Sequence, residues 1–509
     1  MTGEYIIPFV QNFPFFSIFL PIICAIFCLP LRERYAKWLT FISHIALTAL
    51  SAALLAFTIQ TGKSFTYMMG HFPAPFGNEL SAGAVEAFMA LLFCFVSLLS
   101  VAGGLRDISV DVPSDKINYY YLMQNILIGA MLAIVYTNDI FTAFVFIDII
   151  TIAACSIISI KPGGRSLAAT MKYLIMSLMG SSLLLLSIAL IYGVTGHLLM
   201  PNLKLGVAAL IAAGEYTVPL FVLAASMMAG LTIKSALFPF HGWLPDAHSS
   251  ATTAASAVLS GLIIKCYLVL QIKLVYRVFG LQTIGLLRIS HVLLVFGVAG
   301  IVYGSWKAIR QRDIKQMLSY SSIAQIGYIV TAIGLNTNAG MAVACFHIAV
   351  HAIAKAMLFT AAGGLAGVSG NRKDFDSLRG AARRDPFSGA AFIVGALSMI
   401  GIPFFPGFAS KLYLTLAALE TPYAAFVVPV VVVAGTLLGA MYYIPAIACI
   451  IAKRAESPAA AESAAAVTHA PLSLIYGAAL AGFIALTFFL GIFFQPVLRI
   501  IERGLAVLG

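Results

Sequence analysis

Long apolar runs dominate this sequence, and charged residues are too scarce to cover a water-exposed surface. Of its 509 residues, 61% are hydrophobic and only 10% are charged, whereas soluble domains carry about 25% charged residues. Because a helix needs about 20 apolar residues to cross a bilayer, we predict an all-α polytopic membrane protein with about 14 transmembrane helices. The expected spans lie near residues 14–30, 38–60, 81–103, 119–136, 140–160, 168–194, 217–238, 252–275, 286–306, 316–334, 340–363, 387–419, 424–451 and 472–496.

The basic residues are distributed as in membrane proteins rather than as in nucleic-acid-binding proteins. The net charge is +11, but the lysines and arginines lie in short loops between apolar runs, which excludes a continuous basic surface for nucleic acid. Most of them fall in loops that follow odd-numbered spans, and such loops usually face the cytoplasm. This asymmetry predicts that both termini lie outside the cytoplasm. On the same count, Lys273 and Arg277 belong to an outer loop.

Two of the expected spans are interrupted by proline and glycine. Such a break frees backbone amides and carbonyls, which a membrane tolerates only where protein or water surrounds them. Each break therefore predicts a hydrated cavity near the middle of the bilayer, and paired interrupted helices are typical of transporters with internal repeats. The residues at the breaks are Pro239, His241, Pro245 and His248 in the seventh span and Pro403, Pro406 and Gly407 in the twelfth.

Several expected spans contain ionisable side chains. A lysine or carboxylate at the bilayer centre costs about 2.5–3.5 kcal/mol and usually pairs or lines a wet cavity. We expect Asp148 to be the carboxylate partner of Lys234, so that the closed pair holds a proton and the open pair passes it on. His347, His351 and Lys355 share one helical stripe because each lies four residues after the last. The candidate proton-transfer residues are Asp148, Lys234, Lys265, His347, His351, Lys355 and Lys411.

Other interpretations of these residues stay open at this point. Lys265 or Lys411, taken alone, can extend its ammonium toward an interface while its stem stays in lipid. His347 and His351 have the spacing of a zinc pair, but no third ligand with matching spacing is present. The seven cysteines form no C-x-x-C motif, so we expect neither a metal site nor an iron–sulfur cluster in this chain.

Four longer motifs, taken in order, resemble a known family. They are K-S-A-L-F-P-F-H-G-W-L-P-D-A-H over 234–248, Q-R-D-I-K-Q-M-L-S-Y-S-S-I-A-Q-I-G-Y over 311–328, H-I-A-V-H-A-I-A-K-A-M-L-F over 347–359 and G-I-P-F-F-P-G-F-A-S-K over 401–411. With these motifs, roughly residues 65–440 are similar to the antiporter-like membrane subunits of Mrp-type cation/proton antiporters, membrane-bound hydrogenases and respiratory complex I.

This resemblance implies a fold of fourteen helices, in which helices four to eight and nine to thirteen form two inverted repeats. The corresponding divisions are an N-terminal three-helix segment (1–110), the repeats (111–280 and 281–452), and a linker with a C-terminal helix (453–509). The resemblance also implies that the proton path uses Asp148, Lys234, Lys265, His347, His351 and Lys411, with Lys355 at a lysine position common in the family. Two features depart from the family pattern. The fifth-helix acid is usually glutamate, and the stretch after L-P-D-A lacks its usual proline, so we expect a more regular start of the eighth helix.

The function implied by the resemblance is proton translocation within a larger membrane assembly, with H⁺ and possibly Na⁺ as the ions. The motif G-H-F-P-A-P-F-G over 70–77 is most similar to the antiporter-like D-type chain of Mrp Na⁺/H⁺ antiporters and its hydrogenase counterpart, proteins of the prokaryotic inner membrane. The alternative is a proton-pumping subunit of a complex I-type NADH-quinone oxidoreductase, and a stand-alone solute carrier is a third interpretation. The sequence has no flavin, nicotinamide or haem motif. We therefore expect no cofactor here, other membrane subunits and lipid as partners, and any redox site on a partner.

Overall fold

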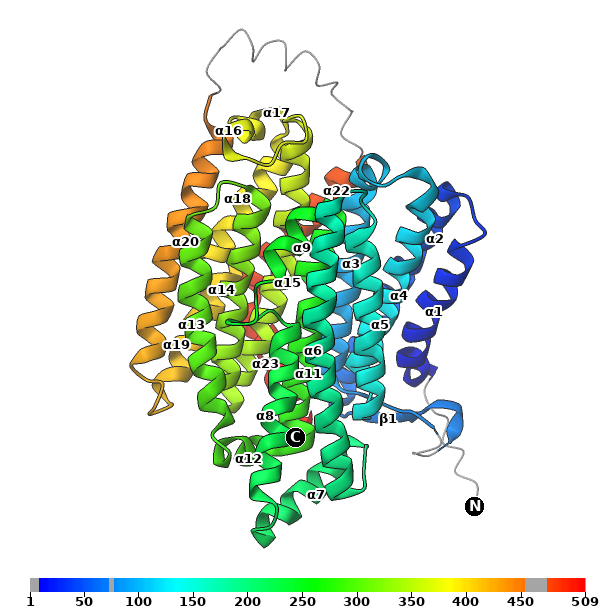
Figure 1. Ribbon diagram of the computed structural model, residues 1–509, viewed down its shortest axis with the longest axis vertical. Helices are drawn as coiled ribbons and strands as arrows, with labels where there is room; N and C mark the ends of the chain where they lie inside the picture. The colour runs from blue at the N-terminus through cyan, green and yellow to red at the C-terminus, as the bar shows by residue number, and fades with distance from the viewer. Residues whose placement is uncertain (1–8, 73–76, 454–473, 509) are drawn as a thin grey trace.

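The computed structural model describes residues 9–72, 77–453 and 474–508, and helices make up most of this part of the chain. Twelve helices in these ranges are long and apolar enough to cross a membrane, and all of them coincide with expected spans. The two other expected spans are the helix Ile314–Gly334 and the pair Pro386–Ile400 and Pro406–Leu419. The predicted all-α polytopic architecture is therefore confirmed. Figure 1 shows most of the helices running side by side along the long axis.

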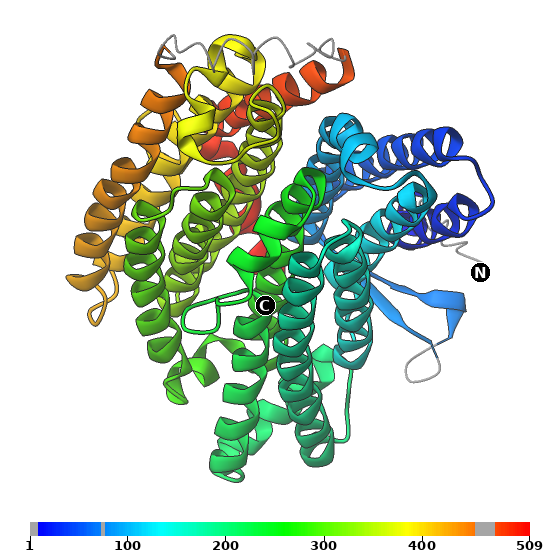
Figure 2. The same ribbon diagram turned by 45° about the horizontal axis from the view of Figure 1, so that its top comes forward.

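Three long helices and a small hairpin form the N-terminal part of the chain. Their bounds are η1 (Phe9–Asn12), α1 (Phe13–Cys28), α2 (Glu33–Thr61), β1 (Phe65–Met68), η2 (Met69–His71), β2 (Glu79–Ala82), α3 (Ala84–Asp111) and η3 (Ser114–Lys116). The two strands pair antiparallel, with Phe65 opposite Ala82, and Figure 2 shows the hairpin projecting beyond the helices. Residues 73–76, within the motif over 70–77, lie outside the described residues.

The next part of the chain contains the first broken span. Its elements are α4 (Ile117–Tyr136), α5 (Ile140–Ser159), α6 (Gly164–Thr195), α7 (Met200–Ala213), α8 (Thr217–Lys234), α9 (Leu244–Ser250), α10 (Thr253–Val258), η4 (Leu259–Ile263), α11 (Ile264–Leu274), η5 (Val275–Phe279) and α12 (Gly280–Leu286). The segments η4 and η5 are π-helical, and α10 to α12 form one continuous helical span.

Two expectations about this region are wrong. The eighth helix does not start regularly, because the chain breaks between α9 and α10 and then forms the π-helical segment η4. Lys273 and Arg277 do not lie in an outer loop, because the eighth span continues past residue 275 and carries them in α11 and η5, where both are buried.

The second broken span and a C-terminal helix pair complete the chain. The elements are α13 (Ile289–Ile309), α14 (Ile314–Gly334), α15 (Asn338–Gly367), α16 (Phe375–Leu378), α17 (Ala381–Arg384), α18 (Pro386–Ile400), α19 (Pro406–Leu419), α20 (Val427–Ile451), α22 (Leu474–Ile492) and α23 (Phe494–Leu508). The last helix is amphipathic and packs its apolar face against α15 and α3. The expected Ala-rich linker over 459–466 lies outside the described residues.

Side-chain caps fix where several helices of the bundle begin. The amides in the first turns of α5, α14 and α18 donate to the carboxylates of Asp139, Asp313 and Asp385 at 2.7, 2.8 and 3.1 Å, and Thr337 accepts from the first turn of α15 at 3.0 Å. Such caps satisfy amides that have no partner within the helix. They therefore set the register in which α5, α14, α15 and α18 present their polar residues.

Two spans lie at the centre of the bundle and are enclosed by the others. Every residue in the apolar windows of Thr253–Leu286 and Asn338–Gly367 is buried, whereas only a third of the window is buried in outer spans such as α1, α2, α20 and α22. Polar side chains on α11 and α15 are therefore shielded from lipid. They must find their hydrogen-bond partners within the protein or in water held by it.

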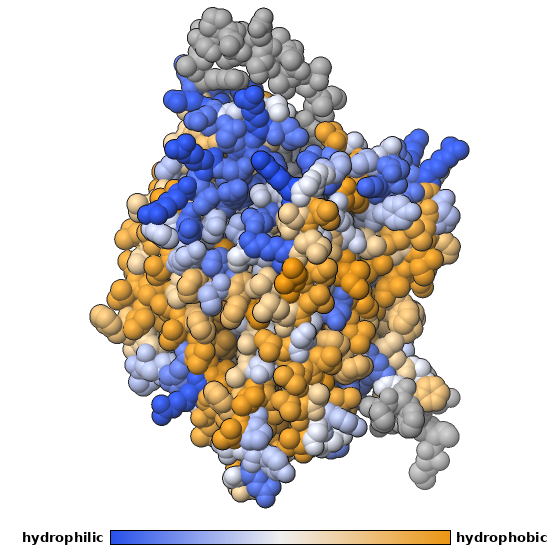
Figure 3. Space-filling model, in the orientation of Figure 1, coloured by the Kyte–Doolittle hydropathy of each residue, from blue (hydrophilic) through white to orange (hydrophobic). Residues whose placement is uncertain are grey.

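The two ends of the molecule differ in polarity. Figure 3 shows hydrophilic side chains gathered at the end where α16 and α17 lie, and a largely apolar surface over the rest of this face. The chain positions with many basic residues, such as those before α16, fall at this hydrophilic end. In Figure 1, α1 begins and α23 ends toward the opposite end of the molecule.

Candidate functional site

Lys234 is the last residue of α8 and therefore lies directly before the first break, as predicted. Its side chain is 1% exposed, and Nζ donates a hydrogen bond of 3.0 Å to Oγ1 of Thr151 on α5. The indole of Trp243, at the other end of the break, donates to the carbonyl of Ile233 at 3.2 Å. The break thus places an ammonium in the interior and satisfies one of the carbonyls that the helix end leaves free.

The expected direct pair between Asp148 and Lys234 is wrong. The carboxylate of Asp148 accepts a hydrogen bond from the hydroxyl of Ser181 at 2.5 Å, while Lys234 bonds Thr151, one turn further along α5. No ion pair joins the two residues in the part of the chain that the structure describes. The aspartate is one methylene shorter than the glutamate usual in the family, and Ser181 takes up its carboxylate. Asp148 still acts on Lys234 through its electrostatic field.

Two histidines and two prolines occupy the first break and the half-helix that follows it. Pro239 lies in the turn, and Pro245 lies in the first turn of α9, where a missing N–H costs nothing. The ring of His241 lies 4.7 Å from that of Tyr303, near the edge of the break. His248 is fully buried and stacks on a phenylalanine of α15 at 4.6 Å. Both ring nitrogens of His248 lack a hydrogen-bond partner among the described residues.

Lys265 lies on the central span, directly after the π-helical segment η4. The residue is fully buried, and Nζ donates to the carbonyl of Ser260, five residues earlier. The hydroxyl of Ser260 contacts that of Ser322 on α14 at 2.9 Å. The ammonium is therefore held by a neutral oxygen in the interior and does not reach an interface, which removes the snorkelling interpretation for this lysine.

His347, His351 and Lys355 lie along α15 in the predicted stripe, and all three are buried. Lys355 donates to the carbonyl of Leu318 at 2.9 Å, to the hydroxyl of Ser321 and, at 3.2 Å, to the hydroxyl of a tyrosine on α20. These acceptors are all neutral oxygens. Lys355 is therefore held in the interior between α14 and α20 without a carboxylate partner.

The two histidines of the stripe differ in how well they are bonded. In His347, Nδ1 contacts the hydroxyl of Ser410 at 2.8 Å and Nε2 contacts the amide oxygen of Gln325 at 3.0 Å. In His351, neither ring nitrogen has a partner among the described residues, and its ring lies 6.3 Å from that of His347. Because His347 already uses both nitrogens, the geometry does not favour a zinc pair.

Lys411 lies on α19, just after the second break, as predicted. Its Nζ donates to the carbonyls of Met399 and Ile400 at 3.1 and 2.7 Å, and to Oγ1 of Thr436 at 3.3 Å. These two carbonyls belong to the last turn of α18, where carbonyls have no amide partner within the helix. The lysine therefore satisfies the end of one half-helix from the start of the next, where the helix dipole also favours a cation.

The proline and glycine residues of the second break allow this close approach. Pro403 lies in the turn, and Pro406 lies in the first turn of α19. A Cβ atom at Gly407 would collide with the carbonyl oxygen of Ser398, so only glycine fits there. This contact brings α19 against the end of α18 and thereby brings Lys411 to the carbonyls.

Six of the seven predicted residues form one buried row across the protein, and the seventh lies beside it. The row runs from Asp148 on α5 through α8, α11 and α15 to Lys411 on α19. Electrostatic contact connects neighbouring members: His351 is influenced by Lys265, Lys355 and His347, and His347 in turn by Lys411 and Lys265. His248 joins this row through Lys265 and Lys355, while His241 faces Lys307 and Lys172 instead.

Some residues of the site were not predicted from the sequence. They are the neutral partners Thr151, Ser181, Ser260, Gln325, Ser410 and Tyr443. Single hydroxyl and amide residues carry no pattern of their own, so no sequence signal identifies them. Lys315 is also buried, and it donates to the carbonyl of Ala251 at 3.1 Å. Its position in the conspicuous motif over 311–328 is the signal that points to it.

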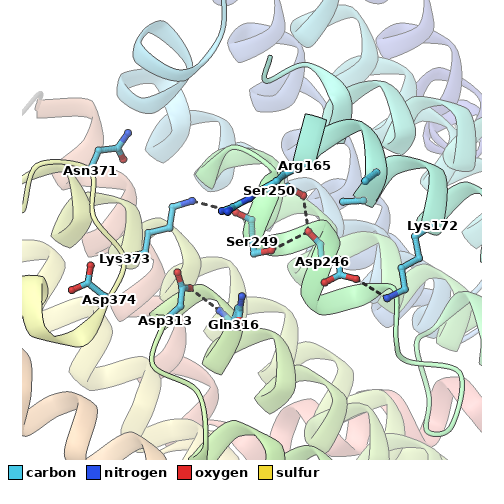
Figure 4. A pocket seen from close by; sticks show the side chains of 12 residues that line it. Arg165, Lys172, Asp246, Ser249, Ser250, Asp313, Gln316, Asn371, Lys373 and Asp374 are labelled. Atoms are coloured by element: carbon cyan, nitrogen blue, oxygen red, sulfur yellow. Dashed lines mark hydrogen bonds and ion pairs between the residues drawn. The ribbon is translucent and has the colours of Figure 1, made fainter. Parts of the chain in front are cut away.

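A polar cavity of about 760 Å³ opens beside α9 at the hydrophilic end. Figure 4 shows Lys172 of α6 and Asp246 of α9 in an ion pair, which measures 2.6 Å, and Lys373 reaching the carbonyl of Ser249 at 3.3 Å. Burial lowers the pKa of Lys373, and the nearby Lys161 lowers it further. The cavity therefore reaches the outer side of the short helix that carries His248.

The arrangement is suited to moving protons over short steps. Its lysines bond hydroxyls and carbonyls rather than carboxylates, so an ammonium can lose its proton without breaking a strong charged pair. Two buried histidines, His248 and His351, keep ring nitrogens unpaired. Buried polar atoms of this kind usually bind ordered water. Within the described ranges, no group of histidine, cysteine, aspartate and glutamate side chains is arranged to hold a metal ion.

Comparisons with known proteins agree with this geometry. The family model described as "NADH:quinone oxidoreductase/Mrp antiporter, TM" matches residues 137–439. The N-type membrane chain of the NADH-quinone oxidoreductase of Desulforudis audaxviator is 32% identical over 439 residues, which cover 85% of each chain. The D-type membrane chain of the Na(+)/H(+) antiporter of Alkalihalophilus pseudofirmus is 28% identical over 416 residues, covering 80% of this chain and 81% of the relative. A chain of the membrane-bound sulfane sulfur reductase, an archaeal respiratory membrane complex, superposes with a TM-score of 0.86 at 26% identity and covers 97% of both chains.

Replacing Lys411 separates its structural role from its charge. Lys411→Met removes the donor for the carbonyls of Met399 and Ile400, and we expect a loss of about 1–3 kcal/mol because a buried acceptor is left unpaired. Lys411→Gln keeps an N–H donor, although on a shorter side chain, and should restore part of that stability. The measurement is the temperature at which the purified protein loses its monodisperse chromatographic peak. Equal stability of the Met variant and the wild type would contradict the assignment.

Proposed function

Because the chain belongs to the NADH:quinone oxidoreductase/Mrp antiporter transmembrane family, we propose that it translocates protons as one subunit of a multisubunit membrane complex. The single observation that carries the proposal is the buried row of protonatable side chains that joins the two broken helices. The row begins at Asp148 and Lys234 and ends at Lys411. The structural relative is likewise part of a multisubunit membrane complex, which supports placing this chain beside other membrane subunits.

The proposed path follows the row across the bundle. A proton passes from Lys234 to Lys265, then through His351 and His347 to Lys411, with water completing the gaps between side chains. The absence of carboxylate partners for these lysines in the described part of the chain supports reversible protonation. Lys355 lies beside the path, and its charge influences His351. Its proposed role is to set the protonation of that histidine.

Asp148 and Lys234 act as the proposed switch at the start of the row. In the structure each has a neutral partner, Ser181 for the carboxylate and Thr151 for the ammonium. Rotation of the side chains can exchange these partners for each other. The closed ion pair would hold the proton on Lys234, and the separated arrangement would let it move on, because an opposite charge nearby favours the charged form.

The two broken spans also support the proposed repeats. Residues 111–280 hold the α8–α9 break with Lys234 before it, and residues 281–452 hold the α18–α19 break with Lys411 after it. We propose that these segments are the two inverted repeats, preceded by the segment 1–110 and followed by 453–509. The polar cavity beside α9 is the proposed entry from the cytoplasm, since the basic loops lie at that end. Both termini then face outward from the inner membrane of a prokaryotic cell.

The kind of complex decides what drives the protons. One of the relatives belongs to an Na(+)/H(+) antiporter and another to an NADH-quinone oxidoreductase. We propose that this chain is the D-type component of an Mrp antiporter or its hydrogenase counterpart, with H⁺ and possibly Na⁺ as the transported ions. The alternative is the proton-pumping subunit of a complex I-type enzyme, whose redox centres would lie on partner subunits. A stand-alone solute carrier is the weakest of the three, because titratable groups rather than a substrate-shaped polar set line the interior.

Substitution of Lys234 tests the proposed path. Lys234→Ala removes a proton carrier at the first break, and we expect transport to fall by about 100-fold or more, the usual contribution of a positioned proton-transfer group. The matched control is Lys63→Ala, which removes an exposed lysine from the loop before β1. The measurement is the internal pH of proteoliposomes that hold the intact complex, under the driving force to which the wild-type complex responds. Transport at the wild-type rate in a folded Lys234→Ala complex would exclude the path.

Native mass spectrometry distinguishes the kinds of complex. The complex is isolated through an N-terminal affinity tag on this chain in mild detergent. We expect small membrane subunits alone to accompany an antiporter component, whereas soluble iron–sulfur subunits would identify a redox-driven pump. A chain that purifies alone and still transports ions would overturn both assignments in favour of a solute carrier.

A further inference from the structure

A second group of buried charges lies outside the row described above. It consists of Glu86, Lys273, Arg277, Glu79 and Asn138, and we call it the outer charge cluster. These residues come from the first turn of α3, the end of the eighth span, strand β2 and the turn before α5. Each is at most 9% exposed. The cluster lies at the end of the bundle near the hairpin, away from the basic loops.

The cluster is connected by hydrogen bonds and one ion pair. Arg277 lies 3.3 Å from Oε1 of Glu86 and donates to the amide oxygen of Asn138 at 2.6 Å. The amide nitrogen of Asn138 in turn donates to Oε1 of Glu79 at 2.6 Å. Glu86 also accepts from the backbone of Gly83 through Oε2 at 3.1 Å. The other carboxylate oxygen of Glu86 is thus the one that faces the cluster.

Lys273 links the outer charge cluster to the row. It follows Lys265 by eight residues, so the two share one helical stripe and lie about 12 Å apart along the axis. Its Nζ donates to the carbonyls of Val135 and Thr137 at 2.7 and 2.5 Å. Glu86 acts on Lys273 electrostatically, as does Arg277. Lys273 therefore repeats, closer to the outer end, the arrangement of a buried ammonium held by neutral oxygens.

A small cavity separates Lys273 from Glu86. It has a volume of about 10 Å³ and is bordered by both residues, by Cys345 of α15 and by Leu508 at the end of α23. This volume is close to the minimum that holds one water molecule. Oε1 of Glu86 and Nε of Arg277 are buried without a hydrogen-bond partner among the described residues. The cavity and the unpaired polar atoms point together to a bound water between Lys273 and Glu86.

We propose that Glu86 is the proton-release group toward the outer face, an inference that rests on the proposed function. Lys273 gives a proton to the cavity water, which passes a proton to Oε1 of Glu86, so that one N–H bond breaks and one O–H bond forms. Lys273 regains a proton from Lys265, and Glu86 releases its proton toward Glu79 and the hairpin. The charged and titratable groups that face Glu86 are Lys273, Arg277, Tyr136 and Cys345. Leu508 closes the cavity from the C-terminal helix.

A purely structural role would be that Glu86 ties α3 to the eighth span through Arg277 and caps α3 through Gly83. Glu86→Gln keeps an oxygen acceptor for the cap but cannot carry the proton. We expect it to lower transport by about tenfold or more while the complex stays assembled and equally heat-stable. The control is Asp111→Asn, which removes the acid of the Lys161–Asp111 ion pair at the other end of α3 and should leave transport unchanged.

Substitutions of Leu508 distinguish proton release from a structural role without touching any charge. Leu508→Trp fills the cavity and should slow transport, whereas Leu508→Ala enlarges it and should leave transport at or above the wild-type rate. A structural tie predicts no difference between these two variants. All variants are measured in proteoliposomes that hold the intact complex, alongside Lys234→Ala.

The outcomes separate this inference from the proposed function. Loss of transport in Lys234→Ala together with loss in Glu86→Gln and Leu508→Trp supports both. Loss in Lys234→Ala with wild-type rates in Glu86→Gln and Leu508→Trp overturns the release site alone. Wild-type transport in Lys234→Ala overturns the proposed function itself. Loss of transport in Glu86→Gln that parallels a loss of heat stability, with no effect of Leu508→Trp, assigns Glu86 a structural role and overturns the inference.

Discussion

A helix that stops inside a bilayer leaves carbonyl oxygens without donors, and in this protein a side chain from across each break supplies the donor. Trp243 donates to the end of α8, and Lys411 donates to the end of α18. These bonds make the breaks compatible with a water-poor interior. They also hold a lysine beside each break, because Lys234 ends one half-helix and Lys411 lies in the first turns of another. The positions of both lysines therefore follow from satisfying the backbone.

Enclosure of the central spans has a second consequence. Because α11 and α15 are surrounded by other helices, Lys265, His351 and Lys355 avoid the cost of facing lipid, and neighbouring helices supply their partners. Most of those partners are hydroxyls and carbonyls. A cation bound in this way is stabilised enough to stay in the interior and is not fixed by a carboxylate. This balance is the physical basis for moving protons through the bundle instead of storing permanent charges in it.

The sequence predicted much of the fold and of the row, for reasons that can be stated. Apolar length located all the spans, and proline located both breaks, because each of these signals reflects a local requirement of the backbone. The ionisable residues were conspicuous because they interrupt apolar runs. The positions of Lys234 and Lys411 beside the breaks followed directly. The repeats and the roles of the individual residues stay predictions.

The parts that the sequence did not predict depend on contacts between distant segments. The Asp148–Lys234 pair is absent because Ser181 and Thr151 compete for the two groups, and side-chain reach cannot be judged from separate segments. Lys273 was assigned to a loop because apolar length alone does not reveal that the eighth span continues as a buried π-helical segment. Its spacing of eight residues from Lys265 was the available signal, since that spacing places both on one stripe.

The central claim is that protons pass along the buried row, and His351 offers the most direct test of it. Both of its ring nitrogens lack partners among the described residues, so His351→Leu removes a proton carrier from the middle of the row without removing a hydrogen bond between side chains. The control is His44→Leu, which replaces a buried histidine on α2 whose Nδ1 contacts the carbonyl of Thr40 at 2.8 Å. The measurement is proton transport by the intact complex in proteoliposomes. The account predicts that His351→Leu folds normally and loses transport while His44→Leu retains it, and wild-type transport in His351→Leu would contradict the account.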